Sequence, residues 1–133
     1  SLRDSPEPIV GVGGLTMGAD PIATAAAFAS TLDGGPHIHS FYVRKEAKGH
    51  GTEAYLEGLN NFPDRGRVVV LEDTSTTGAS AWKAVERTRA AGFEVAWVLT
   101  VVDRQEGAAE YLAERGVEMR SLVTRAELEA ARA

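Results

Sequence analysis

Residues 68–80 read VVVLEDTSTTGAS, and the interpretation of the whole sequence starts from them. Val68–Leu71 is an apolar run of the kind that forms a strand buried on both faces of a sheet. Two acids follow it directly, Glu72 and Asp73, and hydroxyl side chains then lead to Gly78 and a helix-prone segment. The order strand, polar loop and helix is the repeating unit of α/β domains. The stretch therefore predicts a parallel sheet with a polar loop at the carboxyl end of one strand.

The rest of the sequence extends this alternation in both directions. Strands are predicted at 9–12, 37–43, 67–71, 95–102 and 117–122, and helices at 19–30, 79–91, 107–115 and from 125 onward. Thr124 and Glu127 have the spacing of a capping box at the start of the last helix. We therefore expect an α/β domain over residues 1–133, with a central, mostly parallel β-sheet flanked by helices on both faces.

Composition limits the class of protein. A length of 133 residues suits one domain with one core. The formal net charge of -5 argues against nonspecific nucleic-acid binding. No apolar run approaches the roughly 20 residues that a membrane-spanning helix needs. The sequence has no cysteine, which excludes disulfides and thiolate metal sites and is compatible with a cytoplasmic location.

The segment from Thr74 to Ser80 has the properties of a phosphate site. It leads into a helix N-terminus, where free backbone N–H groups and the helix dipole favour an anion. Hydroxyl groups can add donors, and Gly78 lets the backbone turn closely. The alternative interpretation is a helix cap rich in Ser and Thr, which is common.

The two acids Glu72 and Asp73 are harder to explain as structural residues. An acid at the end of a central strand loses hydration unless it has a partner, and adjacent acids repel each other. A sugar diol or a hydrated divalent cation would satisfy both. Acids placed directly before an anion-binding loop suit a ligand with a polyhydroxyl middle and a phosphate end, such as a phosphorylated ribose.

A second polar segment, RKEAKGHGTEAYLEG at 44–58, follows a predicted strand. It is punctuated by glycines and is predicted to be a long, mobile loop with a functional role. Its first seven residues hold four basic side chains: Arg44, Lys45, Lys48 and His50. Mobile basic loops can close over an anion and stabilise a departing charge, although a solvated run of charges is the usual alternative.

Together these segments resemble the orotate phosphoribosyltransferases of the type I phosphoribosyltransferase superfamily. VVVLEDTSTTGAS is similar to the superfamily's phosphoribosyl pyrophosphate signature. RKEAKGHG resembles the orotate branch's catalytic loop, R-K-x-x-K-x-H-G, at every position. VGGLTMGADPIA at 12–23 resembles the pyrophosphate loop, and VVDRQEG at 101–107 resembles a D-R-x-E-x-G segment. These four segments, in the same order as in the family, cover most of the chain.

The resemblance implies a type I phosphoribosyltransferase core that transfers ribose 5-phosphate from phosphoribosyl pyrophosphate to orotate. The products would be orotidine 5′-monophosphate and pyrophosphate, on the route to UMP. Mg²⁺ would be required and bound mainly through phosphoribosyl pyrophosphate, with no metal ligand assigned to the protein. The family also implies a homodimer in which loop 44–58 reaches the neighbouring site. Two departures are Met17, where many members have lysine, and the lack of a counterpart to the family's N-terminal hood.

The resemblance also assigns residues to the ribose phosphate. Glu72 and Asp73 would hold the ribose hydroxyls, directly or through water and metal. The 5-phosphate would be held by the loop that follows, namely Thr74, Ser75, Thr76, Thr77, Gly78, Ala79 and Ser80.

Further residues are assigned to the other two ligands. Thr76 and Arg104 match positions that contact orotate. The family's loop that covers the pyrophosphate corresponds in this sequence to Arg44, Lys45, Lys48 and His50. The predicted catalytic residues are Lys48, Arg44, His50 and Asp73.

Two alternatives stay open on the sequence alone. One is a phosphoribosyltransferase for another base. The other is a regulator that binds phosphoribosyl pyrophosphate without catalysis, against which the presence of Lys48 argues. Two further acids have structural interpretations: Asp20 is expected to cap a helix, and Asp103 either pairs with Arg104 or simply ends its strand.

Overall fold

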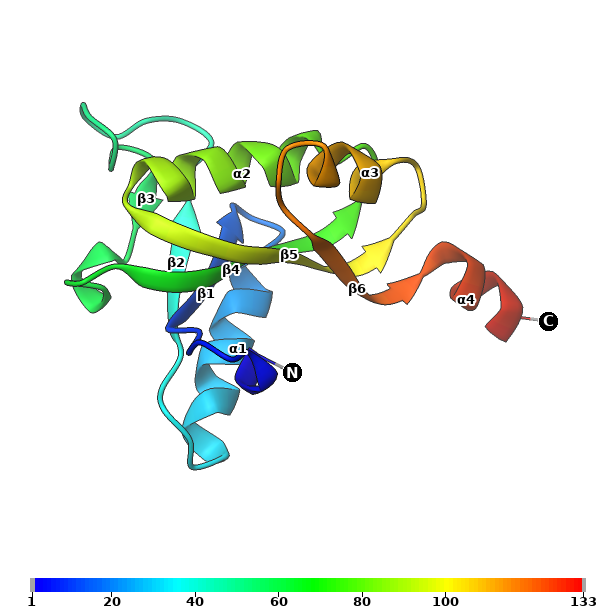
Figure 1. The fold of residues 1–133 in the computed structure, drawn as a ribbon, viewed down its shortest axis with the longest axis horizontal. Helices are drawn as coiled ribbons and strands as arrows, with labels where there is room; N and C mark the ends of the chain where they lie inside the picture. The colour runs from blue at the N-terminus through cyan, green and yellow to red at the C-terminus, as the bar shows by residue number, and fades with distance from the viewer. Residues whose placement is uncertain (1, 133) are drawn as a thin grey trace.

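The computed structural model describes residues 2–132. Its centre is a six-stranded sheet with the order β3-β2-β1-β4-β5-β6 (Figure 1). The strands are β1 (Gly11–Leu15), β2 (His39–Val43), β3 (Leu56–Glu57), β4 (Gly66–Ser75), β5 (Phe93–Asp103) and β6 (Met119–Thr124). All pairings are parallel except that of β3 with β2. The predicted α/β class with a mostly parallel sheet is confirmed.

Helices cover both faces of this sheet, as predicted. They are α1 (Asp20–Leu32), α2 (Ala79–Ala90), α3 (Ala108–Ala113) and α4 (Arg125–Ala131), with short 3-10 turns at Leu2–Asp4 and Leu59–Asn61. Figure 1 shows α1 on one face, α2 and α3 on the other, and α4 extending beyond the β6 edge. None of the helices within residues 2–132 is long and apolar enough to cross a membrane.

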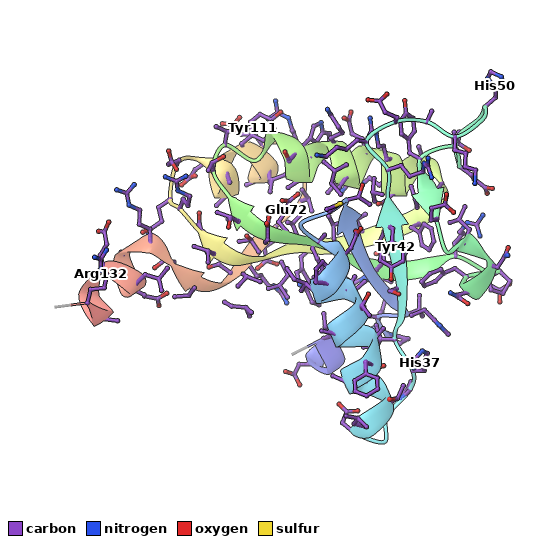
Figure 2. All side chains as sticks on the ribbon, turned by 180° about the vertical axis from the view of Figure 1, so that it is seen from behind. His37, Tyr42, His50, Glu72, Tyr111 and Arg132 are labelled. Atoms are coloured by element: carbon purple, nitrogen blue, oxygen red, sulfur yellow. The ribbon has the colours of Figure 1, made fainter. Side chains whose placement is uncertain are left out.

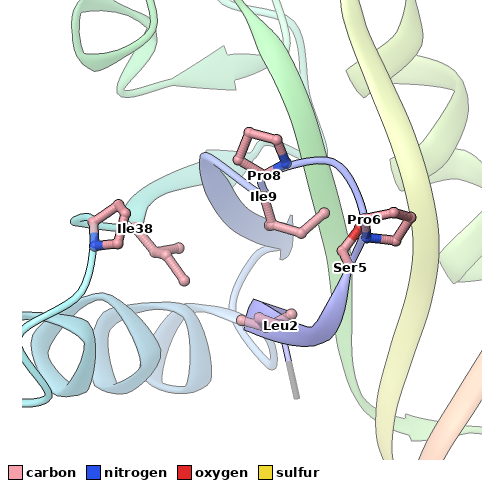
Figure 3. Close-up of a pocket in the computed structure, with 7 residues that line it drawn as sticks. Leu2, Ser5, Pro6, Pro8, Ile9 and Ile38 are labelled. Atoms are coloured by element: carbon pink, nitrogen blue, oxygen red, sulfur yellow. The ribbon is translucent and has the colours of Figure 1, made fainter.

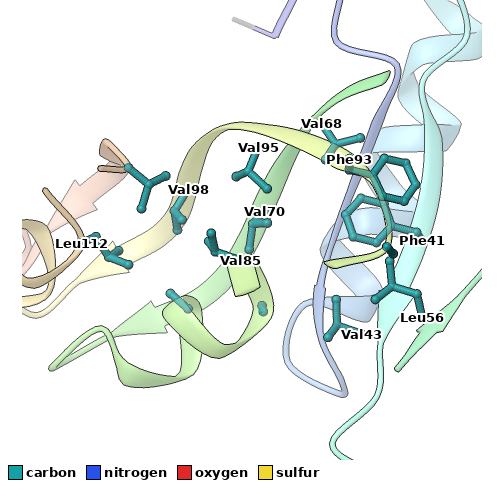
Figure 4. Close-up of a cluster of buried hydrophobic side chains, with 14 of the residues drawn as sticks. Phe41, Val43, Leu56, Val68, Val70, Val85, Phe93, Val95, Val98 and Leu112 are labelled. Atoms are coloured by element: carbon teal, nitrogen blue, oxygen red, sulfur yellow. The ribbon is translucent and has the colours of Figure 1, made fainter. Parts of the chain in front are cut away.

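Two clusters of buried side chains join these layers. On the α2 side, Phe41, Val70 and Val85 are fully buried together with Val98 and Leu112 (Figure 4). On the α1 side the cluster consists of Ile9, Val12, Ala19, Ala23, Ile38, Val69, Leu71 and Trp97. Alternate residues of β4 thus enter opposite clusters, as the side-chain period of a strand requires. This explains why the central strand is apolar at every position.

Strand β1 differs from its prediction because its glycines lie inside the strand. Gly13 and Gly14 were expected to close a strand at 9–12, but β1 runs to Leu15. A side chain at Gly14 would collide with the carbonyl oxygen of Leu71, and one at Gly13 with that of Phe41. These glycines therefore permit close approach of neighbouring strands.

Two other boundaries also differ from the prediction. β4 continues to Ser75 because it stays paired with β5 up to Asp103, so Thr74 and Ser75 belong to the strand. The expected loop 44–58 ends early, because Leu56 of β3 pairs with Val43 of β2. Both differences arise from strand pairing, which local sequence does not reveal.

The predicted capping box is confirmed. Thr124 Oγ1 accepts a hydrogen bond from the Glu127 backbone N–H at 3.2 Å, and the Thr124 N–H donates to Glu127 Oε2 at 2.7 Å. This reciprocal pair satisfies two backbone donors at the start of α4.

Candidate functional site

The parallel strands bring four connecting segments to one edge of the sheet. They follow β1, β2, β4 and β5 and comprise residues 16–19, 44–55, 76–78 and 104–107. Binding sites in open parallel sheets lie at this carboxyl edge. The four segments singled out in the sequence therefore begin at the same edge of the sheet.

Residues 76–78 form a tight connection, here called the cradle, between β4 and α2. A cavity of about 50 Å³ lies within it, lined by Glu72, Thr74, Ser75, Thr76, Thr77, Gly78, Ala79, Ser80 and Ala81. The N-cap of α2 is Gly78 at φ 92°, and it has no side-chain cap hydrogen bond. The interpretation of this loop as a Ser/Thr helix cap holds only in part, because Thr77 Oγ1 accepts one long hydrogen bond, of 3.5 Å, from the Ala79 N–H. The next backbone N–H groups in the first turn of α2 face the loop.

Gly78 could not be another residue without local rearrangement. A Cβ atom there would lie 3.1 Å from Tyr111 Cδ1 and 3.2 Å from Ala108 Cα, and the positive φ favours glycine. The cradle is thus packed against α3 as well as against the sheet.

The two acids after the apolar run face different surroundings. Glu72 lines the cradle cavity and is buried, and its Oε1 has no hydrogen-bond partner among the described residues. Burial, and secondly the negative charge of Asp73, raise the pKa of Glu72 to about 7. Asp73 is exposed and accepts a hydrogen bond from the Thr74 N–H at 2.7 Å. Because successive residues of a strand point to opposite faces, the acids do not form one side-by-side pair.

The segment 16–19 passes beside Asp73. A Cβ atom at Gly18 would lie 2.8 Å from the Asp73 Cγ, so only glycine fits this approach without a shift. Met17 is 78% exposed at the same turn. This contact joins the predicted pyrophosphate loop to the end of β4.

Asp20 is not the helix cap that was expected. It is the first residue of α1, whose N-cap is Ala19 with no side-chain hydrogen bond. Its Oδ1 is buried without a hydrogen-bond partner among the described residues, and burial raises its pKa. It lines a cavity of about 530 Å³ together with Thr16, Met17, Tyr42, Arg44, Lys45, Glu46 and Glu57. Sequence reasoning missed Asp20 as a site residue, although its place after the glycine turn was a usable signal.

The segment after β5 lies against the end of β4. The Arg104 N–H donates to the Ser75 carbonyl at 3.0 Å, and the Arg104 guanidinium pairs with Glu106 at 3.2 Å. Asp103 ends β5 and accepts a hydrogen bond from the Gln105 N–H at 2.8 Å. Of the two interpretations of Asp103, the strand end is confirmed and the ion pair with Arg104 is not formed.

The segment of residues 44–55, here called the basic loop, is held at its two ends, and residues 45–53 between them are exposed. The Arg44 N–H donates to the Tyr55 carbonyl at 2.6 Å, and the Lys48 N–H to the Ala54 carbonyl at 2.7 Å. Arg44 Nη1 also pairs with Glu57 Oε1 at 2.8 Å. Figure 2 shows all side chains, with His50 at the tip of the loop and well apart from Glu72 in the same chain. The loop tip thus does not reach the cradle of its own chain in this conformation.

A different cavity lies away from these segments. It has a volume of about 290 Å³ and is lined by Leu2, Ser5, Pro6, Pro8, Ile9, Pro36 and Ile38 (Figure 3). Ile9 precedes β1 and Ile38 precedes β2, so the cavity lies at the amino edge of those strands. It is not part of the candidate site.

The sequence matches no protein-family model, but comparisons with individual proteins are informative. The chain is 52% identical over 113 residues to an orotate phosphoribosyltransferase from Nostoc, matching 85% of this chain and 54% of that protein. It is 53% identical over 116 residues to one from Aquifex aeolicus, matching 87% of this chain and 62% of that protein. The chain thus spans somewhat more than half the length of these relatives.

A solved structure agrees with this likeness. It is the Mycobacterium tuberculosis orotate phosphoribosyltransferase in complex with 5-phospho-alpha-D-ribosyl 1-diphosphate. It superposes with a TM-score of 0.76 at 43% identity, over 95% of this chain and 68% of that one.

Proposed function

The chain belongs to the orotate phosphoribosyltransferase family, and from this premise we propose that it transfers ribose 5-phosphate from phosphoribosyl pyrophosphate to orotate. The products are orotidine 5′-monophosphate and pyrophosphate. The observation that carries the proposal is the cradle, where Glu72 Oε1 is buried without a hydrogen-bond partner among the described residues and lines one cavity with the first residues of α2. This is one site for a hydroxyl-bearing group joined to an anion.

The ribose 5-phosphate occupies this edge of the sheet. The phosphate accepts hydrogen bonds from the backbone and hydroxyls of residues 74–80, where the α2 dipole also favours a negative charge. Glu72 and Asp73 hold the ribose hydroxyls, directly or through water. Because the two acids leave β4 on opposite faces, they approach the sugar from different sides.

Mg²⁺ fits this site as a companion of the substrate. Carboxylate oxygens and phosphates are its preferred partners, and Glu72 Oε1 is an oxygen without a hydrogen-bond partner among the described residues. The described residues hold no cluster of three or more His, Cys, Asp or Glu side chains able to cage a metal. The residues that would hold the ion through water are Glu72 and Asp73, and its other partners would be pyrophosphate oxygens. When bound, it would supply positive charge beside the leaving group.

The pyrophosphate lies between residues 16–19 of one copy and the basic loop of the second copy. Displacement at the anomeric carbon develops positive charge on the sugar and negative charge on the departing pyrophosphate. The protein contributes by orienting the reactants, by placing Arg44, Lys45, Lys48 and His50 over the leaving group, and by excluding water. Lys48 is the principal cation in this step.

A homodimer accounts for the position of the loop tip. His50 lies far from Glu72 of its own chain (Figure 2), which supports a basic loop that serves the site of a second copy. The described residues 2–132 constitute one core domain in this proposal, with residues 44–55 as its mobile catalytic loop. The cysteine-free sequence is compatible with a cytoplasmic enzyme.

Orotate is placed by Thr76 and Arg104. The backbone bond from Arg104 to Ser75 keeps this arginine at the cradle, and its guanidinium can exchange Glu106 for a carboxylate of the base.

The test combines calorimetry with a product assay. Phosphoribosyl pyrophosphate is titrated into the chain with and without Mg²⁺, beside Asp73→Asn and, as a matched control, Asp64→Asn, an exposed acid before β4 at the opposite edge of the sheet. We expect Mg²⁺-dependent binding that is weakened in Asp73→Asn alone, and formation of orotidine 5′-monophosphate when orotate is added.

Two outcomes would redirect the proposal. Turnover with adenine or hypoxanthine but not with orotate would identify an enzyme for another base. Binding without turnover on any base would identify a regulator.

A further inference from the structure

One arginine of helix α2 contacts both ends of the basic loop. Arg87 Nη1 donates a hydrogen bond to the Arg44 carbonyl at 2.6 Å, and the Arg87 Cζ lies 3.9 Å from the centroid of the Tyr55 ring. Arg44 and Tyr55 are themselves joined by a backbone hydrogen bond of 2.6 Å. These three residues, which we call the loop clamp, close the base of the loop against the helix.

The same helix carries the cradle at its other end. Gly78 is the N-cap of α2, and Arg87 lies nine residues further on, roughly 13 Å along the helix axis. Ala84, Val85 and other buried residues of α2 pack on the sheet, so the helix is a rigid connector. Helix α2 therefore fixes the position of the base of the basic loop relative to the cradle of the same chain.

Beyond the clamp the loop has few contacts, of which the main ones are the hydrogen bond from the Lys48 N–H to the Ala54 carbonyl and the ion pair of Glu53 with Arg65. Residues 45–53 are exposed, and Gly49 and Gly51 have no atoms within 4 Å of an added Cβ. The direction in which Lys48 leaves the protein surface is therefore decided mainly at the base of the loop. A small rotation there moves the exposed tip through a larger distance.

We propose that Arg87 is a positioning residue, which fixes the base of the loop on helix α2 so that Lys48 is presented over the pyrophosphate at the site of the second copy. This inference rests on the proposed function for its catalytic consequence, and on contacts alone for its structural part. Arginine suits the task because its planar guanidinium donates in its plane while its face stacks on an aromatic ring. Lysine can retain the charge but not both contacts.

The kinetic test compares four variants with the unmodified chain. For Arg87→Ala we expect kcat to fall roughly tenfold, with the Kd for phosphoribosyl pyrophosphate changed less than about twofold. The kcat of Arg87→Lys should lie between those of Arg87→Ala and the unmodified chain. The kcat of Tyr55→Phe should equal that of the unmodified chain, because the aromatic ring is retained. Lys83→Ala is the control, since it removes an exposed cation from the same helix.

Hydrogen exchange tests the structural part without requiring turnover. In Arg87→Ala the amides of Arg44 and Lys48 should exchange about tenfold faster, while that of Trp82, bonded to the Gly78 carbonyl at 2.9 Å, should be unchanged. If the variant does not fold, Arg87→Lys provides the same comparison.

Each result decides something. Unchanged exchange at Arg44 and Lys48 overturns the proposal whatever the activity. Faster exchange with unchanged kcat, or with Kd weakened as much as kcat, overturns the positioning role. If the unmodified chain shows no turnover, the proposed function fails, and exchange still establishes whether Arg87 holds the loop.

Discussion

The cradle and the basic loop are built in opposite ways. The cradle joins β4 to α2 through residues 76–78 and is packed against α3, whereas residues 45–53 of the loop are exposed. Their glycines show the difference, because Gly78 at φ 92° has close neighbours and Gly49 at φ 87° has none within 4 Å. A site that binds a phosphate gains from rigid, preorganised donors, whereas one that must admit a substrate and then cover it needs a segment that moves.

The largest expected effect, which tests this contrast between a rigid cradle and a mobile loop, is that of Lys48→Ala. We expect kcat to fall by roughly 10²–10³-fold, because a cation that stabilises the leaving group acts mainly in the transition state. Binding of phosphoribosyl pyrophosphate should largely survive, since the cradle is untouched. Steady-state kinetics and calorimetry measure the two effects, and an equal loss in both would place Lys48 in ground-state binding.

The pH dependence of stability tests the burial of Glu72. The folded-state pKa of about 7 exceeds the ordinary value of 4.5, so between these values the folded protein retains a proton that the unfolded chain has lost. This contribution is complete below about pH 4.5 and is lost as the pH rises through about 7. From pH 5 to pH 8 the free energy of unfolding should therefore fall by about 2.5 kcal/mol because of this group.

Urea denaturation at the two pH values measures this change. Glu72→Gln should reduce the difference, whereas Glu86→Gln, an exposed control on α2, should leave it intact. The same pH dependence in Glu72→Gln as in the unmodified chain would contradict a buried, proton-retaining Glu72.

Two glycine substitutions compare the regions directly. Gly78→Ala should lower the free energy of unfolding by about 2 kcal/mol, because the new methyl group meets Tyr111 and Ala108 at a positive φ. Gly49→Ala has a similar φ but open space, so its cost should be about 1 kcal/mol or less. Thermal or urea unfolding of both variants measures these losses. Equal losses of stability would mean that packing around Gly78 does not add to the cost of the substitution.

The smallest expected effect concerns Met17. Met17→Lys adds a cation at an exposed position of the turn beside Asp73, and should strengthen binding of pyrophosphate a few-fold. Calorimetry at low and high salt measures it, and the gain should shrink at high salt because the position is exposed. Weaker binding would show that this turn does not face the pyrophosphate.

Much of the fold was predictable because local patterns and tertiary packing agree. The apolar run at 68–71, the helix after Gly78 and the capping box at Thr124 all lie where expected. The prediction was wrong where a long-range contact overrides a local pattern. Gly13 and Gly14 indicated the end of a strand, yet they lie within β1, where neighbouring strands approach too closely for a side chain.

Other features of the candidate site could not be placed in space from the local sequence. Asp20 looked like a helix cap, and only the structure places its carboxylate beside the end of β2 with Lys45 and Glu57. Arg87 was not singled out in the sequence, because its partners Arg44 and Tyr55 lie far from it along the chain.

The sequence by itself determined the α/β class, the order of the polar segments and the family resemblance, because strand periodicity, helix caps and motifs are local properties of the chain. Only the tertiary structure decided that Glu72 is buried while Asp73 is exposed, that Gly18 approaches Asp73, and that α2 links the cradle to the base of the basic loop. These features depend on which strands pair and on which helix covers which face. Pairing and coverage are set by the burial of the whole chain, so no short stretch of residues encodes them.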